Sequence, residues 1–483
     1  MHETLRTRMG WLHAWIGFAF GLLLVCVFIS GTVSVFDTEL TRWLQPEAPP
    51  EAVSPTADAL DRSLPTVHSL MVEGKWPFIT FPSPRDPYLR IQHYDGAEFL
   101  SVPLDPGTGT PLPVRQTAGG TFFYNLHASL RSGETGMMFV TFSGAALLVM
   151  LGSGLIIHLR GLVSDLTLLR PHAQRLRAWL DVHVLSSVPF IPFAIVMAYT
   201  GAFIHVRTIL PPVSYVTFLR TALTSAPANT AQPPPPVTTK DIPPISGMVT
   251  HAEAALGPAG FALFSGDTLL VSRTDASGPE LTRDHIDFSL KTGKQTGSAF
   301  LTTPIARTQA VLTGLHYGRW AGPSMRWLYF LSGLAGTVMI SSGLIFFLMK
   351  RRRQSGHLPV FRLAEGLAIS VILGFPFAIL GVLWANRLIP VGIPDRPIAE
   401  VRSFFILWAF SALVGLITSC SGYPLAGWKT LLWGLVLAGT LLTPLDFLTR
   451  PGATPFHAPT VFAATDLVAL LAALCSFQVA RRL

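Results

Sequence analysis

The chain contains LHASLRSGETGMMFVTFSGAALLVMLGSGLI at residues 126–156 and LHYGRWAGPSMRWLYFLSGLAGTVMISSGLI at residues 315–345, two versions of one pattern. Each begins with Leu-His, passes through a short polar segment and continues into an apolar run of about 20 residues, the length that crosses a bilayer as helix. Corresponding positions are separated by 189 residues: His127 and His316, Gly133 and Gly322, Gly144 and Gly333, Gly154 and Gly343. The constant separation predicts an internally duplicated membrane protein.

A second constant separation relates the helices before these stretches. His13 and His183, Gly17 and Ser187, and Gly31 and Gly201 are all 170 residues apart. The repeated unit is therefore a helix, a polar module and a second helix, and the longer second module accounts for the difference between the two separations.

The composition excludes several protein classes. Of 483 residues, 50% are hydrophobic and 13% are charged, whereas a soluble domain usually carries about 25% charged residues. The net charge of +8 comes from short segments that flank apolar runs, so no nucleic-acid partner is needed to explain it. The cysteines lie within apolar runs, which excludes a disulfide scaffold, and no CxxCH motif for covalent c-type haem occurs. The cysteines are Cys26, Cys420 and Cys475.

Eight apolar runs are long enough to span a membrane. They cover residues 11–36, 136–159, 184–206, 325–349, 363–385, 403–421, 427–446 and 460–479. The first run exceeds the roughly 7–15 apolar residues of a signal peptide, so we expect a retained anchor helix. The predicted fold class is a mainly α membrane protein with about eight transmembrane helices. It has a duplicated helix–α+β module–helix unit that forms a four-helix core, and four further C-terminal helices.

Lysine and arginine predict the orientation. They cluster at the N-terminus, at 160–177, at 350–362, at Lys429 and at the C-terminus, five segments that share one side if both termini are cytoplasmic. Arg387, Arg396 and Arg402 depart from the rule in the short outer loop 386–402. The two long polar segments then lie outside the cytoplasm. Each is predicted to be a small α+β module, and the second begins with a Pro-rich linker.

These expectations divide the chain into eight parts. They are span one at 1–36, an outer module at 37–122, span two at 123–160, a cytoplasmic loop at 161–182, span three at 183–207, a second outer module at 208–320, span four at 321–350, and a C-terminal region with spans five to eight at 351–483.

Four repeated histidines are the candidate cofactor ligands. His13 and His183 begin outward-going helices at the cytoplasmic boundary, whereas His127 and His316 precede inward-going helices at the outer boundary. Two imidazoles per membrane leaflet, from two different helices, are what bis-histidine ligation of one b-type haem per leaflet requires. The sequence therefore predicts two b-type haems with His13 and His183, and His127 and His316, as axial ligands of the iron.

Glycines at defined spacing extend this prediction. His13 precedes Gly31 by 18 residues and His127 precedes Gly144 by 17, intervals that return to the same helix face after roughly 25–27 Å. Each helix would then ligate one haem near its N-terminal end and present a bare position to the other haem. Gly201 and Gly333 repeat the pattern after His183 and His316, and Gly17 leaves room for a flat macrocycle beside His13.

Alternatives remain open for each of these residues. A boundary histidine often only forms interfacial hydrogen bonds, and glycines on spans often serve close helix packing. His158 and His205 lie near span ends and are reserve ligands. Nearby arginines are candidate partners of haem propionates or simple boundary anchors: Arg8, Arg131, Arg175, Arg177, Arg319 and Arg326.

The blocks GWLHAWIGFAFG (10–21), NLHASLRSGETG (125–136), DVHVLSSVPF (181–190) and LHYGRWAG (315–322) resemble those of the PepSY-associated transmembrane family. The resemblance covers about residues 1–355, including the hairpins LDPGTG and LKTGK. It implies an iron-regulated bacterial inner-membrane protein similar to di-haem ferric-siderophore reductases, with the four histidines as ligands. WLDV before His183, where the family has a more basic sequence, and spans five to eight depart from the family pattern.

The function hypothesis is a transmembrane electron conduit. It reduces a ferric siderophore or other ferric chelate in the periplasm and releases Fe(II). No GxGxxG, P-loop, flavin or nicotinamide motif is visible, so a separate quinol or flavoprotein would supply the electrons. An alternative is a non-catalytic membrane-tethered PepSY regulator or scaffold. A third is a siderophore or iron transporter, which the near absence of ionisable residues in spans five to eight disfavours; Glu365 and Asp466 lie near span ends.

Overall fold

The computed structural model describes residues 4–49, 56–94, 99–159, 174–205, 242–452 and 460–483. Within these residues, eight helices are long and apolar enough to cross a membrane, which confirms the predicted spans. The first four spans are α1 (Leu5–Ser34), α6 (Gly133–His158), α8 with α9 (Arg175–Ile204) and α14 (Pro323–Ser355). The last four are α15 with α16 (Pro359–Leu388), α17 (Arg396–Cys420), α18 (Pro424–Thr449) and α19 (Thr460–Arg482).

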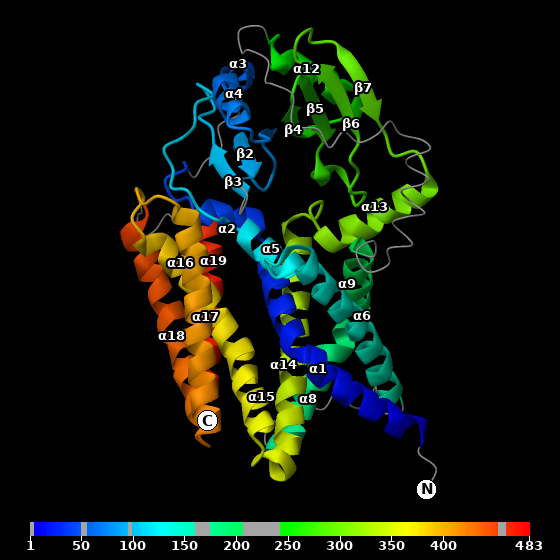
Figure 1. Ribbon diagram of the computed structural model, residues 1–483, viewed down its shortest axis with the longest axis vertical. Helices are drawn as coiled ribbons and strands as arrows, with labels where there is room; N and C mark the ends of the chain where they lie inside the picture. Colours follow the sequence, from blue (N-terminus) through cyan, green and yellow to red (C-terminus); the bar gives the residue numbers. More distant parts are fainter. Residues whose placement is uncertain (1–3, 50–55, 95–98, 160–173, 206–241, 453–459) are drawn as a thin grey trace.

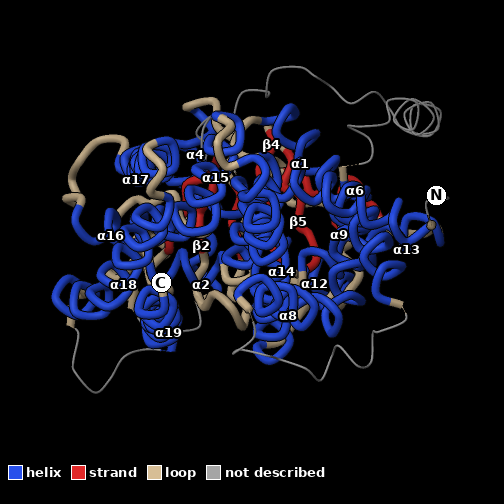
Figure 2. Tube along the Cα trace, turned by 90° about the horizontal axis from the view of Figure 1, so that it is seen from below, coloured by secondary structure: helices blue, strands red, loops and turns tan. Residues whose placement is uncertain are grey.

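The spans form two groups. In the first, α1 packs against α6 and α14, α14 packs against the first half of the third span, and α6 packs against its second half. In the second, α16, α17, α18 and α19 pack on one another, and α15 packs against both α17 and α14. Seen along the helices, the two groups lie side by side (Figure 2).

Two spans are interrupted by short non-α turns. The third divides into α8 (Arg175–Ser187), a 3-10 turn η1 (Val188–Phe190) and α9 (Ile191–Ile204). Pro189 and Pro192 remove backbone donors there, so the α-helical hydrogen-bond pattern cannot continue through the turn. The fifth divides into α15 (Pro359–Ile369), a π-helical turn η4 (Ser370–Gly374) and α16 (Phe375–Leu388).

The polar segments between the spans contribute to a single sheet. The first provides helices α3 (Ala57–Arg62) and α4 (Leu64–Val72) and strands β1 (Phe78–Thr80), β2 (Arg90–Tyr94) and β3 (Phe99–Pro103). The second provides α12 (Ile245–Leu256) and strands β4 (Ala259–Ser265), β5 (Thr268–Arg273), β6 (His285–Ser289) and β7 (Gln295–Ala299). Both polar segments therefore contain helices and strands, as an α+β module requires, whereas the Pro-rich linker and most of the loop 161–182 lie outside the described residues.

The two modules are not separate bodies. The strand order is β3-β2-β1-β4-β5-β6-β7, and β1 pairs with β4 in antiparallel register, with Ile79 opposite Ala262. Each module alone would leave an edge strand with unpaired backbone groups, and this pairing satisfies them. One face is covered by α3, α4 and α12, where Ile79, Val67 and Met248 belong to a shared core.

Three short helices lie between this sheet and the spans (Figure 1): α2 (Asp37–Trp43), α5 (Thr121–Ser129) and α13 (Pro304–Tyr317). Leu130 and Arg131 adopt left-handed backbone conformations after α5, and Gly318 does so after α13. These residues separate α5 from α6 and α13 from α14. His127 and His316 are consequently carried by their own short helices and not by the spans that follow.

Two histidine-lined cavities

The four predicted histidines meet in two pairs. His127 on α5 and His316 on α13 line one cavity of about 150 Å³, called here the sheet-side cavity. Their ring centroids are 6.0 Å apart and their planes are 22° from parallel. His13 on α1 and His183 on α8 line a second cavity of about 340 Å³, the far-side cavity. Their ring centroids are 6.1 Å apart, with planes at 70°.

Each histidine is fixed through the same ring nitrogen. Nδ1 of His13, His127 and His183 lies 3.0, 2.9 and 2.7 Å from the carbonyl oxygens of Met150, Val27 and Met339. A carbonyl oxygen only accepts hydrogen bonds, so Nδ1 carries the proton in all three rings.

His316 follows the same rule through a hydroxyl. Its Nδ1 lies 3.0 Å from Oγ1 of Thr200, and that hydroxyl donates to the Val196 carbonyl at 2.6 Å. The Thr200 oxygen therefore accepts from the ring. No described residue hydrogen-bonds to Nε2 of any of the four rings, so each Nε2 keeps its lone pair, the state that a metal-binding imidazole needs.

Glycines allow the rings to approach. An added Cβ at Gly31 would lie 2.7 Å from Nδ1 of His127, and one at Gly201 would lie 2.8 Å from Cε1 of His316. In the far-side cavity, Cβ atoms at Gly154 and Gly343 would lie 3.1 and 3.0 Å from the rings of His13 and His183.

The position of each glycine has a helical explanation. Gly31, Gly154 and Gly343 lie four residues after Val27, Met150 and Met339, whose carbonyls bond the rings. In a helix the residue at i+4 stands over the carbonyl of residue i. A bare position there exposes the carbonyl to an imidazole from a neighbouring helix.

Burial affects the protonation of the two sheet-side histidines, which lie outside the spans. Loss of solvent lowers the pKa of His127 and lowers that of His316 to about 3. Both rings are thus neutral near pH 7, and the neutral ring is the form that binds a metal ion.

The structure corrects part of the predicted glycine set. Gly31 and Gly201 line the sheet-side cavity and Gly17 lines the far-side cavity, as expected. Gly144 and Gly333 were predicted to face the far-side cofactor, but they line the sheet-side cavity. The prediction was wrong because α5 and α13 are separate helices, so the spacing from His127 and His316 does not run along one helix axis.

The two cavities differ in the polar residues that line them. The sheet-side cavity is lined by Arg85, Arg319, Asp37 and the tyrosine pair Tyr124 and Tyr317, whose hydroxyls are 3.0 Å apart. Arg85 forms ion pairs with Asp37 at 2.9 Å and with Glu39 at 2.6 Å. The far-side cavity is mostly apolar, with Lys350 at its lining. Sequence analysis missed Arg85 and the tyrosines, although Tyr317 follows His316 directly.

The other predicted residues have mixed positions. His158 lines the far-side cavity and His205 lines the sheet-side cavity. Among the arginines, Arg319 lines the sheet-side cavity and pairs with Asp275 at 2.8 Å. Arg326 instead pairs with Glu39, and the remaining four line neither cavity: Arg8, Arg131, Arg175 and Arg177.

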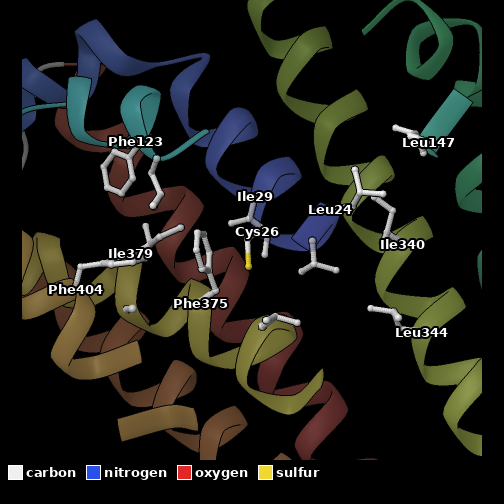
Figure 3. Close-up of a cluster of buried hydrophobic side chains, with 14 of the residues drawn as sticks. Leu24, Cys26, Ile29, Phe123, Leu147, Ile340, Leu344, Phe375, Ile379 and Phe404 are labelled. Atoms are coloured by element: carbon white, nitrogen blue, oxygen red, sulfur yellow. The ribbon is translucent and has the colours of Figure 1, made fainter. Parts of the chain in front are cut away.

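The cavities are separated by a thin apolar layer. Leu147 of α6 lines both of them. Leu24, Ile340 and Leu344 belong to the same buried cluster, and they extend from α1 and α14 into one region (Figure 3). Leu24 lines the sheet-side cavity, Ile340 and Leu344 line the far-side cavity, and Leu147 lies between them.

The C-terminal spans contain more buried charge than predicted. Arg387 pairs with Asp446 at 2.7 Å and Arg396 pairs with Glu400 at 2.5 Å, all four side chains being at most 1% exposed. The expectation that these spans hold almost no ionisable groups was wrong. Arg387, Arg396 and Glu400 lie in helical turns beyond the apolar runs, and Asp446 is the last residue of the run 427–446.

A comparison with protein families explains the arrangement of the first four spans. The family model described as "PepSY-associated TM region" matches residues 10–350. The chain belongs to this family. The match includes all four histidines and both polar modules, and it ends where the additional C-terminal spans begin. A comparison with curated proteins gives no match.

Proposed function

We propose that this PepSY-associated protein is a di-haem b electron conduit of the bacterial inner membrane. Electrons would enter at the far-side cavity from a quinol or flavoprotein and leave at the sheet-side cavity to a ferric siderophore or ferric chelate in the periplasm. Reduction would release Fe(II), which hard oxygen chelators bind weakly. Both termini are then cytoplasmic and the sheet is periplasmic.

The paired imidazoles are the observation that supports this proposal. An imidazole nitrogen bonds a metal ion such as zinc at about 2.0 Å, so two opposed rings on one ion have centroids roughly 6 Å apart. The pairs in the two cavities have centroid separations of 6.0 and 6.1 Å. Together with Nδ1 protonation and the bare glycine positions, the residues present fit two bis-histidine haems.

Haem b, when bound, supplies one-electron transfer, and the chain controls where and how readily this occurs. The four histidines would hold the iron, and their carbonyl and hydroxyl partners, which fix the ring orientation, would raise ligand basicity. Arg85 and Arg319 offer positive charge to propionates at the sheet-side cavity. Leu147, which lines both cavities, and its apolar neighbours would separate the two sites.

Absorbance spectroscopy of the purified protein tests the proposal. The oxidised and dithionite-reduced spectra are expected to show b-type haem at about two per chain. Replacing His13 or His183 with Ala should remove one haem, and replacing His127 or His316 should remove the other. A fully folded, colourless protein would favour the regulator or scaffold and refute the conduit. Loss of both haems from every single replacement, with the fold intact, would contradict the division into two sites.

A further inference from the structure

Spans five to eight lie outside the family match, and their contacts point to a structural role. The turn before α5 is held by α17: Glu400 accepts hydrogen bonds through Oε2 from the Thr117 hydroxyl at 2.6 Å and from the Ala118 backbone N–H at 3.0 Å. Through Oε1 it accepts from Asn386 at 2.7 Å and from Arg396 at 2.5 Å. The carboxylate is fully buried, so all its partners are protein groups.

Apolar contacts continue this attachment along α5. Phe122 and Phe123 are both fully buried, and the ring of Phe122 lies 5.2 Å from that of Phe404 on α17. Phe404 in turn contacts Phe375 of α16 at 5.3 Å. Phe123, Phe375 and Phe404 lie in one buried cluster where α5 meets the C-terminal spans (Figure 3), and Phe122 belongs to the same cluster. The first turn of the helix that carries His127 is therefore embedded in α16 and α17.

A second attachment reaches the same turn through α2. Arg387 donates to the Trp43 carbonyl at 2.8 Å, and Asn386 donates to the Leu44 carbonyl at 3.0 Å. The hydroxyl of Thr41 on α2 accepts from the backbone N–H of Gly120 at 2.9 Å. The C-terminal spans thus hold α5 directly through Glu400 and indirectly through α2.

The equivalent helix in the second repeat is held differently. On α13, the Ala310 carbonyl accepts from the Leu281 backbone N–H at 3.1 Å, and the Leu315 carbonyl accepts from the Tyr329 hydroxyl at 2.7 Å. Both partners belong to the second repeat itself. Val311 and Leu312, which correspond to Phe122 and Phe123 at the separation of 189, are only partly buried. Of the two ligand helices, α5 is the one whose described hydrogen bonds and ring contacts involve the additional spans.

We infer that α16 and α17 position His127, with Glu400 as the positioning residue. The geometry assigns to the C-terminal spans the role of an external support for the sheet-side ligand helix, in addition to the packing of α5 on α1 and α6 of its own repeat. The inference rests on the proposed function in so far as His127 binds haem iron. The helix is continuous from Thr121 to Ser129, so a displacement of its first turn is transmitted to the ring.

Glu400→Gln is the test, because no orientation of the amide satisfies the site. If the NH₂ group of the amide points toward α5, it faces the Ala118 N–H, which is also a donor. If it points away, it faces the donor groups of Asn386 and Arg396. Hydrogen exchange of residues 118–129 is expected to accelerate at least about fivefold, since a buried donor loses its acceptor. The sheet-side haem should lose its low-spin signature or shift its midpoint potential, while the far-side haem keeps both.

Glu365→Gln is the matched control. Glu365 is a buried carboxylate of the same group of spans and pairs with Arg352 near the opposite end of the helices. This variant should leave exchange at 118–129 and the sheet-side haem unchanged. A decrease in protein stability alone would affect both variants, whereas positioning of α5 distinguishes them.

Phe404→Ala provides a second test if Glu400→Gln does not fold. It removes the ring beneath Phe122, and Phe410→Ala on the same helix is its control because Phe410 is 53% exposed. Unchanged exchange and an unchanged sheet-side haem in both Glu400→Gln and Phe404→Ala would overturn the inference, as would equal damage to both haems. If the wild-type protein binds no haem, the proposed function fails, and faster exchange at 118–129 still supports α17 as the support of α5.

Discussion

Gly31→Ala is expected to remove the sheet-side haem and to leave the far-side haem in place. The added methyl carbon would lie 2.7 Å from Nδ1 and 2.8 Å from Cε1 of His127. That is about 0.7 Å short of ordinary van der Waals contact, which begins near 3.4 Å. Because Cys26 and Ile29 hold α1 in a buried apolar cluster, the imidazole has to move and not the helix.

The size of the ring displacement decides whether His127 can still bind the haem iron. A shift of about 0.7 Å lengthens the hydrogen bond to Val27 from 2.9 Å to beyond the range of a normal N–H···O bond. Metal–ligand distances tolerate about 0.2 Å, so the ligand bond is lost as well. The better helix propensity of Ala contributes at most about 1 kcal/mol, which overpacking at about 1–3 kcal/mol offsets.

Haem quantification by pyridine haemochrome, normalised to protein, is the assay. The haem content should fall from about two per chain in the wild-type protein to about one in Gly31→Ala. Gly201→Ala should show the same loss, because its Cβ would lie 2.8 Å from His316. Gly154→Ala should reduce far-side occupancy only in part, since the shortfall at 3.1 Å is smaller.

Gly152→Ala is the control. An added Cβ at this position on α6 meets no atom within 4 Å, so the variant tests helix propensity without a clash. It should retain both haems. Two haems with wild-type spectra in Gly31→Ala, or equal loss in Gly152→Ala, would refute the assignment of these glycines as contact positions for the ligand rings.

Three further predictions follow from the geometry. The two haems should give different low-spin EPR signals, because the ligand planes are 22° apart at one site and 70° apart at the other, and ligand arrangement tunes haem electronics; one common signal would contradict this. Arg387→Met should lower the free energy of unfolding by about 3–5 kcal/mol, because it leaves Asp446 buried without its closest cation. Arg62→Met, in an exposed pair, should lower it by under about 1 kcal/mol. Equal effects of the two variants in chemical denaturation would refute the difference. Ile79→Pro in central strand β1 should disrupt the β1–β4 pairing and increase proteolysis of the sheet, with both haems retained; an intact, protease-resistant sheet would show that this pairing is dispensable.

Much of the site was accessible from the sequence because duplication displays it twice. His13 and His183, and His127 and His316, recur at constant separations, and the structure brings each pair to about 6 Å. Gly154 and Gly343 recur in the same way, yet their contact with the ring of a different helix was not predictable. Their role depends on a carbonyl four residues earlier meeting an imidazole from elsewhere in the chain.

Non-local contacts account for the incorrect expectations. The ion pair between Arg387 and Asp446 joins residues 59 positions apart. Neither is conspicuous in a hydropathy profile, because Arg387 follows one apolar run and Asp446 ends another. Gly144 and Gly333 were misplaced because left-handed residues after α5 and α13 turn the chain between the histidine and the span. A short break of this kind leaves little trace in composition.

The sequence by itself determined the eight spans, their duplication and the four histidines, since bilayer thickness imposes a length and an apolar composition on each helix separately. The tertiary structure alone decided that both modules share one sheet, that each Nδ1 is held by a neighbouring helix, and that α17 supports α5. These features are contacts between distant segments, and their free energies depend on which surfaces meet, a property that no single segment carries.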